Sequence, residues 1–515
     1  MFKESYQSAI RFAKIGIDVI RTKNISNDDK RNIARRALAL QFSDARGVMM
    51  KIGQLFAASS DDNNFDTLVK GIPPVPLATM EAVIEDALGA QLNAVFADIE
   101  ESTNAASLGQ VHRAQLLNGA PVAVKIQYPD IAARVDAEMA LIGLMPGVGP
   151  VKKWGFDLAS YKTAFKSNMD RELDYLHEAK IQQRFQQQVD VLGLVVPNVY
   201  PQYSRSQLLV QSWEYGDFID DIGHWPHRDR QRAGEIILGT LFKSLFDIGL
   251  VHGDPHLGNS YFRYAKTGQP EVVLMDYGCT IEISENQRLA LLKLILATTD
   301  NLPLSPLRYF AALGFEADKL AKIGDALPML CRLLFKPFAD SGLFSTLNWQ
   351  LESSVNHLLG ERRWWFRSAG PAELLLILRA FQGITQQLAL LKTTVCWSKI
   401  LQQNVSEATL QQARAFELPM LAEEHELHTK TLNSLANTLH VTVKKQGRKT
   451  ANITLPAEMV LDLENIIPED VLAILSNQKN IDITAIKDRI MASGIAPQNV
   501  FSINSGDKEY SVWLA

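Results

Sequence analysis

The segments VHGDPHLGN (residues 251–259) and EVVLMDYG (residues 271–278) determine how the rest of this 515-residue chain is interpreted. The first segment contains an H-x-D pattern that ends at Asp254, and Asn259 lies five residues after that aspartate. In the second segment an apolar run is followed by Asp276. Phosphoryl transfer uses a carboxylate that faces the attacking group, an amide oxygen that reaches Mg²⁺ from the same loop, and a second carboxylate that holds the metal against the phosphates. Asp254, Asn259 and Asp276 have the residue types and the order that these three roles require.

Each segment alone has a plainer interpretation, because Asp-Gly pairs are common in surface turns and a D-Y-G can simply end a hairpin. Their order, and the β-hairpin that fits between them, favour the catalytic loop and metal-binding turn of a protein-kinase-like fold. We therefore expect ATP or ADP with Mg²⁺ at this place, with Asn259 and Asp276 as the metal ligands.

The composition limits the class of protein. A chain of this length with 47% hydrophobic residues is expected to form several packed units. Its net charge of -5 argues against a general nucleic-acid binder, which needs a clustered basic surface. The three widely spaced cysteines fit reduced thiols in the cytosol better than a disulfide framework.

No targeting or membrane-spanning segment is expected. The first twenty residues carry acidic side chains and lack the apolar core of a signal peptide. The most apolar later stretch, residues 371–392, is interrupted by Glu373, Arg379 and Gln382, so it falls short of a spanning helix. We expect a cytoplasmic protein that could contact a membrane surface peripherally.

The first part of the chain predicts helices. Apolar residues recur at helical spacing as far as about residue 70, where a proline-rich segment ends the pattern. The tetrapeptide KIGQ, with Lys51 and Gln54, lies within this region. On the residues alone, a solvated helix face explains KIGQ as well as any function does.

A β-hairpin follows, formed by VHRAQL and VAVKI on either side of Asn118-Gly119. In kinases such a hairpin follows a glycine-rich loop and carries the phosphate-binding lysine, a position that Lys125 occupies here. The loop before the hairpin is NAASLGQ, and small residues still allow backbone N–H groups to approach phosphates. Alanine restricts the backbone more than glycine does, so we expect a stiffer loop with an altered nucleotide preference. Its candidate nucleotide-binding residues are Ala105, Ala106, Ser107 and Gly109.

Residues 160–188 predict one long helix that carries Glu172, Asp174 and Glu178. The lysine of a kinase needs a glutamate on a helix to orient it, and Glu178 is our choice, although charged residues on a helix are as often only solvated. Residues 207–219 then supply a strand that leads into Glu214 and Tyr215, which fit the hinge that contacts adenine.

The second half is expected to be helical from Glu285 to about Gln412, without the A-P-E segment that docks peptides in protein kinases. From Leu418 the pattern changes to two hairpins, turning at Gln446-Gly447 and Ser505-Gly506, with short helices between them. The basic tip of the first hairpin could meet anionic lipid, but an ordinary solvated turn explains it as well.

Taken together, KIGQ, NAASLGQVH, VAVK, ELDYLHEA, HGDPHLGN and DYG resemble the UbiB/AarF family of atypical kinase-like proteins over roughly residues 30 to 400. KIGQ and the alanine-rich loop are not shared with ordinary protein kinases, which makes the resemblance specific. It implies an α+β, bilobal protein-kinase-like fold with an N-terminal helical extension. The expected units are residues 1–72 (extension), 73–217 (N-lobe), 218–417 (helical C-lobe) and 418–515 (a small α+β appendage).

The resemblance also implies roles for individual residues. It places Lys51 and Gln54 across the would-be substrate site, with Glu172 and Asp174 facing them, and it supports Glu178 as the partner of the lysine. It implies ATPase rather than ordinary protein-kinase activity, and a link to isoprenoid-quinone (ubiquinone) or other lipid metabolism. The open alternatives are a small-molecule or protein phosphotransferase and a nucleotide-gated binding protein without turnover.

Overall fold

The structure is a computed structural model that describes most of the chain after residue 73. The described ranges are 74–142, 155–254, 256–300, 302, 304–324, 326–339, 342–421, 435–436, 438–446, 448–463, 467, 482–492, 495–505 and 508–515. The expected helical extension, residues 1–72, lies outside them, and with it Lys51 and Gln54. Among the described helices, none combines the length and the apolar content needed to cross a bilayer.

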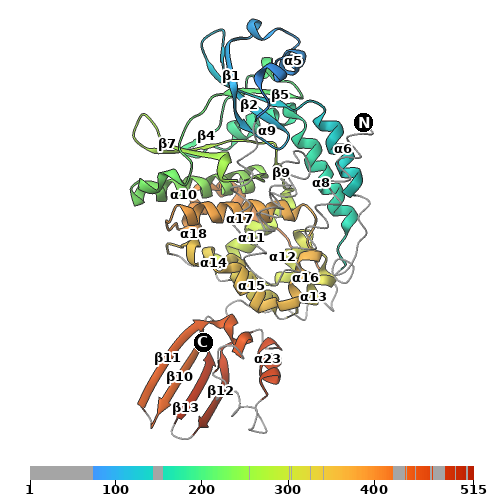
Figure 1. Cartoon of the computed structure of the whole chain (residues 1–515). Helices are drawn as coiled ribbons and strands as arrows, with labels where there is room; N and C mark the ends of the chain where they lie inside the picture. Colours follow the sequence, from blue (N-terminus) through green and yellow to red (C-terminus); the bar gives the residue numbers. More distant parts are fainter. Residues whose placement is uncertain are drawn as a thin grey trace, which may run out of the picture.

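The first lobe contains a four-stranded antiparallel sheet in the order β1-β2-β3-β5 (Figure 1). The predicted hairpin at Asn118-Gly119 is confirmed: Gly119 has a φ of 86°, and its N–H donates to the carbonyl of Leu116 over 2.8 Å. The strand before the hairpin, β1, was not predicted. The bounds are β1 Phe96–Ala105, β2 Gly109–Leu116, β3 Pro121–Gln127 and β5 Leu208–Ser212.

One face of this sheet packs against α5 (Leu77–Leu88), which follows the short proline-rich segment. Met80 and Ile84 lie one turn apart on α5, and both are fully buried against β-branched side chains of β3 such as Val122 and Val124. The helix ends at Gly89, whose left-handed φ of 67° lets its N–H reach back to the last turn.

The predicted single helix over residues 160–188 is wrong. The structure has two helices, α8 (Leu158–Glu172) and α9 (Tyr175–Gln188), which separate at Asp174. The carboxylate of Asp174 accepts hydrogen bonds from the backbone N–H groups of Leu176 and His177, at 3.1 and 3.3 Å. An aspartate that satisfies the free donors of a helix start favours a new N-terminus, and apolar periodicity continues across such a break.

The polypeptide then crosses to the second lobe through Gly216 and Asp217. Asp217 exchanges both backbone hydrogen bonds with Phe262, at 2.8 and 2.9 Å, which fixes the linker against a small three-stranded sheet ordered β4-β8-β7. A second pair, β6 with β9, brings the two segments of the catalytic motif together. These strands are β4 Leu194–Val195, β6 Leu250–His252, β7 Ser260–Tyr264, β8 Pro270–Leu274 and β9 Thr280–Glu282.

The rest of the second lobe is helical, as predicted from Glu285 onward. Its largest core centres on Trp397, which is fully buried beside Phe242, Phe338 and Phe381. In Figure 1, α17 lies between α10 and the helices α14 and α15. The helices of the second lobe are α10 His227–Phe242, η4 (a π-helix) Lys243–Ile248, α11 Glu285–Thr299, α12 Pro306–Ala312, α13 Ala317–Ala321, α14 Ala326–Ala339, α15 Leu351–Leu359, α16 Arg363–Ala369, α17 Leu374–Leu390, α18 Trp397–Asn404 and α19 Glu407–Ala415. One further helix, α6 Ile131–Ile142, follows β3 before the crossing.

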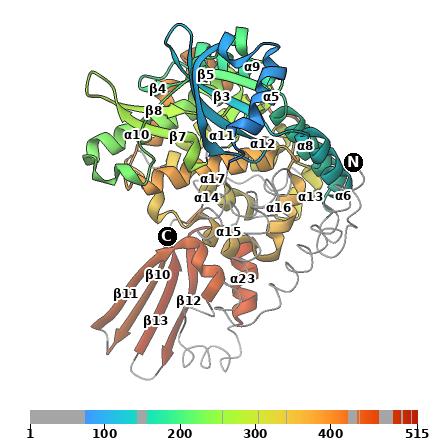
Figure 2. The ribbon, with the colours of Figure 1, turned by 45° about the horizontal axis from the view of Figure 1, so that its top comes forward.

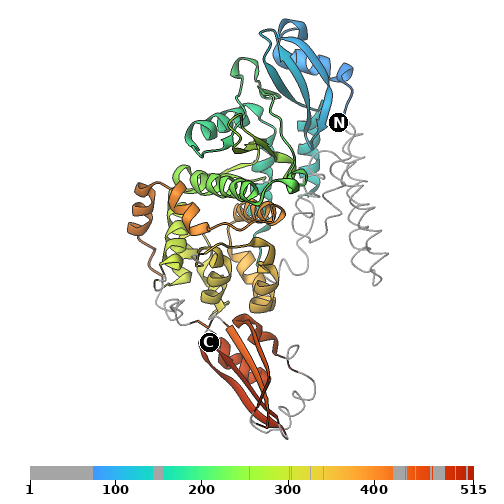
Figure 3. The ribbon, with the colours of Figure 1, turned by 90° about the vertical axis from the view of Figure 1, so that its left-hand side faces the viewer.

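The C-terminal part forms a separate antiparallel sheet ordered β11-β10-β13-β12, and both predicted hairpins are present. Figures 2 and 3 show this sheet at the opposite end of the molecule from the N-terminal sheet. Apolar contact between α15 and η9 (Ala457–Asp462) joins it to the helical lobe, where Leu358 and Val460 are buried in one cluster. The other elements are β10 Thr438–Lys445, β11 Arg448–Pro456, α23 Ile483–Ala492, β12 Gln498–Ser505 and β13 Lys508–Leu514.

Gly109 is needed for packing at the start of β2. A Cβ atom there would collide with the backbone carbonyl of Ile126 on β3 and would lie 2.9 Å from the hydroxyl of Tyr175 on α9. We expect Gly109→Ala to lower the free energy of unfolding by about 1–3 kcal/mol, because a backbone carbonyl has little room to move away. Thermal unfolding followed by circular dichroism measures this loss.

Gly223→Ala is the matched control, because no atom lies within 4 Å of the Cβ that it would add. Its unfolding midpoint should stay close to that of the unchanged protein. Equal midpoints for both variants would contradict a steric role for Gly109.

Candidate active site

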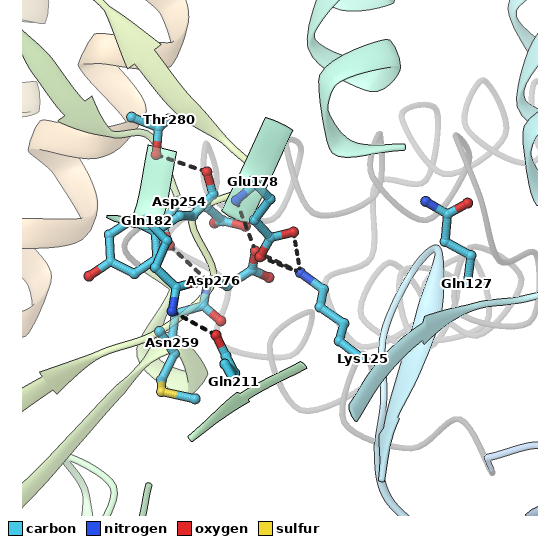
Figure 4. A network of polar contacts seen from close by, with 12 residues as sticks. Lys125, Gln127, Glu178, Gln182, Gln211, Asp254, Asn259, Asp276 and Thr280 are labelled. Carbon is cyan, nitrogen blue, oxygen red and sulfur yellow. Dashed lines mark hydrogen bonds and ion pairs between the residues drawn. The ribbon is translucent and has the colours of Figure 1, made fainter. Parts of the chain in front are cut away.

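Lys125 is the centre of a polar network that joins the two lobes (Figure 4). Its Nζ donates to both carboxylate oxygens of Glu178, at 2.8 and 2.9 Å, and to Oδ1 of Asp276 at 3.1 Å. The lysine comes from β3, the glutamate from α9 and the aspartate from the turn after β8. The structure thus brings together three residues selected from separate motifs, with 53 and 151 positions between the lysine and its partners.

Burial sets the charges of this network. Only 14% of the Lys125 side chain and 2% of the Glu178 side chain are exposed. Burial opposes the charge of the ammonium, but the carboxylates of Asp276 and Glu178 outweigh it and raise the pKa of Lys125 well above its usual value. Burial also raises the pKa of Glu178 to about 7, although the ammonium opposes that rise. Lys125 therefore stays a cation at any physiological pH.

Asp276 differs from Glu178 in its access to solvent, since 41% of its side chain is exposed. Its backbone has a φ of 57°, a left-handed conformation that a side chain rarely adopts outside turns and functional sites. The Oδ1 atom also accepts from the N–H of Gly278 over 3.3 Å. The turn thus holds one carboxylate oxygen in the network with Lys125 and leaves the group open to a ligand.

The loop from Asp254 to Asn259 is fastened to this turn. The side-chain amide of Asn259 donates to the backbone carbonyl of Asp254 at 2.9 Å. The backbone carbonyl of Asn259 accepts from the N–H of Met275 at 2.8 Å. His252 contacts the carbonyl of Met275 through Nε2 at 2.9 Å. Because its nitrogen is used within the loop, the amide oxygen of Asn259 is the atom suited to a metal. Carboxylate and amide oxygens are the ligands that Mg²⁺ prefers, so Asn259 and Asp276 fit such an ion.

Asp254 has a partner that the sequence analysis missed. Its Oδ1 accepts a charged hydrogen bond of 2.6 Å from Nη2 of Arg379, on α17, and each side chain is 12% exposed. Burial opposes the charge of Arg379, but Asp254 and two other acidic groups outweigh it and raise the pKa of the guanidinium. In the sequence, Arg379 was considered only as a charged residue that interrupts an apolar stretch. A single arginine in such a stretch was the available signal, because a buried charge requires a partner.

The alanine-rich turn between β1 and β2 is closed. The N–H of Ala106 donates to the carbonyl of Gly109 over 2.7 Å, so this amide is already used. Ser107 and Leu108 are buried, and Leu108 packs among apolar side chains of α6 and α8. The turn is therefore anchored by this hydrogen bond and by the buried side chain of Leu108, while its expected stiffness stays a prediction.

Glu172 and Asp174, which were expected to act together, have different surroundings. Glu172 is buried and accepts from the side-chain amide of Asn168 at 2.9 Å, and the Oδ1 of Asn168 in turn lies 3.6 Å from the sulfur of Cys279. Glu172 therefore lies close to the residue that follows the D-Y-G turn. Asp174 is exposed and caps α9, so its visible contribution is to the start of that helix.

The expected hinge residues follow β5. Arg263 on β7 donates to the carboxylate of Glu214 at 2.9 Å and to the backbone carbonyl of Tyr215 at 3.3 Å. Its guanidinium also lies 4.8 Å from the centre of the Tyr215 ring. The link between the lobes is thus fastened to the second lobe, and Tyr215 remains 69% exposed.

Comparison with known proteins agrees with this geometry. Residues 67–301 match the family model of the ABC1 atypical kinase-like domain. The "Atypical kinase coq-8, mitochondrial" of Caenorhabditis elegans is 23% identical over 361 residues, which cover 68% of this chain and 48% of the relative. The "AarF domain-containing protein kinase 1" of Xenopus laevis is 29% identical over 258 residues, 47% of this chain and 49% of the relative. The chain therefore spans about half the length of these curated relatives.

Among solved structures, the Rv3197–erythromycin complex from Mycobacterium tuberculosis is 22% identical, with a TM-score of 0.48 and coverage of 73% of this chain and 97% of that one. The Rio2 kinase complex with ADP/Mg²⁺ and phosphoaspartate from Chaetomium thermophilum is 10% identical, with a TM-score of 0.24 and coverage of 44% and 57%. The domain match, together with the two lobes that meet at Lys125, confirms the expected protein-kinase-like fold.

The ion pair at Lys125 generates a prediction about stability and pH. Lys125→Met leaves the buried carboxylate of Glu178 without its cation, which should cost about 3 kcal/mol of unfolding free energy at pH 8. Because burial raises the pKa of Glu178, the folded protein takes up a proton there more readily than the unfolded chain does. Without the ammonium, which lowers it, the pKa of Glu178 in the variant should lie above the value of about 7 that it has beside Lys125. The destabilisation relative to the unchanged protein should therefore be small at acidic pH and grow as the pH rises above about 7.

The matched control is the double variant Lys125→Met with Glu178→Gln, which removes the buried charge. Unfolding midpoints of both variants measured from pH 5.5 to pH 8.5 by differential scanning fluorimetry separate the two contributions. A gap between single and double variant that stays constant over this range would contradict the role of the Glu178 carboxylate.

Proposed function

We propose that this chain binds ATP and ADP with Mg²⁺ and slowly hydrolyses ATP, because it belongs to the UbiB/AarF family of atypical kinase-like proteins. The observation that carries the proposal is the network in which Lys125 meets Glu178 and Asp276. In kinases the corresponding lysine contacts the phosphates and is held by a glutamate on a helix. Lys125 has the charge, the fixed position and the neighbouring exposed carboxylate for that role.

In this proposal the residues of the second lobe hold the metal. Asn259 offers an amide oxygen and Asp276 an accessible carboxylate, from two segments that are hydrogen-bonded to each other. Bound there, Mg²⁺ would offset the negative charge of the phosphates. The turn of Ala105, Ala106, Ser107 and Gly109 would cover the nucleotide, and the linker at Glu214 and Tyr215 would border the base.

The surroundings of Asp254 support water as the acceptor of the phosphoryl group. A carboxylate bound to an arginine at 2.6 Å is a weak base, because the guanidinium stabilises its charged form. Such a group can orient a water molecule but is poorly suited to deprotonating a serine hydroxyl. We further propose that Lys51 and Gln54 lie across the acceptor site near Glu172 and Asp174, which would hinder peptides.

The biological setting that we propose is isoprenoid-quinone (ubiquinone) or other lipid metabolism, at a membrane surface or with a lipid or isoprenoid ligand. Family membership supports it.

The second candidate is a nucleotide-gated binding protein without turnover, which the Asp254–Arg379 ion pair also favours, since it leaves the site without an obvious strong base. A phosphotransferase for a small molecule or a protein is the third. ATP turnover with purified protein, measured without and with a peptide acceptor, separates hydrolysis, transfer to a peptide and binding without turnover.

Asp276→Asn tests the proposed site directly. The change removes the charge that would hold Mg²⁺ but keeps the shape of the side chain, so affinity for ADP with Mg²⁺ should fall at least tenfold, about 1.4 kcal/mol. Isothermal titration of ADP with Mg²⁺ and with EDTA measures this loss. In EDTA, wild type and variant should bind equally weakly.

Asp98→Asn is the control, because Asp98 is an exposed residue of β1 outside the network. Its affinity should match that of the unchanged protein. Unaltered metal-dependent binding by Asp276→Asn would show that the nucleotide binds elsewhere.

The closed turn generates a prediction about nucleotide preference. The N–H of Ala106 can reach a phosphate only if its hydrogen bond to Gly109 opens, and glycine at position 106 makes the required backbone change easier. We expect Ala106→Gly to shift the ratio of ATP to ADP affinity toward ATP by a few-fold, because the freed amide can meet the additional phosphate. Competition binding with both nucleotides gives the ratio, and an unchanged ratio would argue against control by the turn.

A further inference from the structure

The helical lobe contains a large apolar cavity. Its volume is about 300 Å³, and it lies among α10, η4, α11, α14 and α17. Its wall consists mainly of leucine and phenylalanine side chains, including those of Phe242, Phe246, Phe310, Phe335, Phe338 and Phe381. None of its lining residues belongs to the network around Lys125.

The size of this cavity is unusual for a protein interior. Native cores are packed about as densely as organic crystals, with few voids larger than a water molecule. An apolar cavity of even half this volume stays dry and accepts small apolar molecules. Ligand pockets begin at about 300 Å³, which is the volume found here. Leaving such a space empty would lower the stability of the lobe considerably, so an occupant explains why it persists.

The polar part of the lining restricts the chemistry of the occupant. Its members are Glu282, Gln287 and Glu373, and both glutamates are exposed. Leu378, also exposed, lies with them in the lining, so these residues mark where the cavity opens. Arg184 pairs with Glu282 at 3.2 Å and offsets part of its charge. The remaining negative charge disfavours an anionic head group beside an apolar chain.

We propose that this cavity binds a neutral molecule with an extended apolar chain, alkyl or isoprenyl, and that its occupancy is transmitted to Asp254 through α17. Ile377, Ala380 and Phe381 of α17 form part of the cavity wall. Arg379, on the same turn, holds the carboxylate of Asp254 at 2.6 Å. A chain that enters the cavity presses on this turn, and a small movement of Arg379 changes the hold on Asp254. The transmission to Asp254 rests on the proposed ATP hydrolysis, whereas binding in the cavity does not.

Binding is tested without any nucleotide. Decanol and decanoate have the same chain length and differ in the charge of the head group, so they separate the effect of the chain from that of the charge. We expect decanol to raise the unfolding midpoint of the full chain in a saturable way and to displace a fluorescent apolar probe. Decanoate should bind at least tenfold more weakly. No stabilisation by decanol, or tighter binding of decanoate, would overturn the proposed ligand class.

Variants that fill the cavity locate the binding site. Leu291→Trp on α11 adds a large side chain to the lining of the cavity, and Leu334→Phe on α14 is a smaller change in case the first fails to fold. Leu390→Trp is the control, since Leu390 is 38% exposed and lies outside the lining. We expect both filling variants to lose the effect of decanol and the control to keep it. Retention by a folded filling variant would place the ligand elsewhere.

The link to the active site is tested by turnover. Decanol should change the rate of ATP hydrolysis at least two-fold in the unchanged protein. In Arg379→Gln it should still bind, by probe displacement, but leave whatever turnover remains unaffected. Binding without any effect on wild-type turnover would overturn the coupling but not the binding site. An absence of ATP hydrolysis under all conditions would count against the proposed function instead.

Discussion

The structure depends on the ion pair that fixes Lys125 between Glu178 and Asp276. A buried cation is tolerated only with opposite charge beside it, so β3, α9 and the turn after β8 must meet at one point. This requirement explains the break between α8 and α9. By starting a new helix, Asp174 lets α9 run in its own direction and present Glu178, one turn later, to the lysine. Tyr175 completes the contact, with its ring centre 4.9 Å from the ammonium.

The second constraint is the difference in environment between two aspartates of the same lobe. Asp276 is 41% exposed and shares one oxygen with Lys125, whereas Asp254 is 12% exposed and bound to Arg379. Different environments give chemically similar carboxylates different tasks. The exposed carboxylate of Asp276 is suited to binding a metal. The carboxylate of Asp254, which is paired with Arg379, is suited to orienting a neighbouring group rather than to removing a proton. This difference is the structural basis of the proposed preference for water as the phosphoryl acceptor.

Much of this site could be predicted because its residues belong to short segments with fixed spacing. Asp254, Asn259 and Asp276 follow one another within two neighbouring segments, and Lys125 is marked by the hairpin that carries it. Glu178 required an argument about chemistry, since nothing local distinguishes it from a solvated glutamate. The helix break at Asp174 was missed because apolar periodicity continues through it, and the closed turn at Ala106 was missed because its hydrogen bond depends on the strand register.

Arg379 was missed for a different reason, and it shows where the limits of motif-based interpretation lie. The residue is far from Asp254 in sequence and lies outside residues 67–301, which match the family model. Its contact with Asp254 is nevertheless direct, because a charged hydrogen bond at 2.6 Å in a buried place holds the carboxylate in one orientation beside a fixed positive charge. Two chains with identical catalytic motifs could therefore differ in chemistry if the helix that packs beneath the loop differs. In this chain α17 contacts Asp254 through Arg379 and lines an apolar cavity through the neighbours of Arg379, so the surroundings of Asp254 depend on a helix that the motifs do not include.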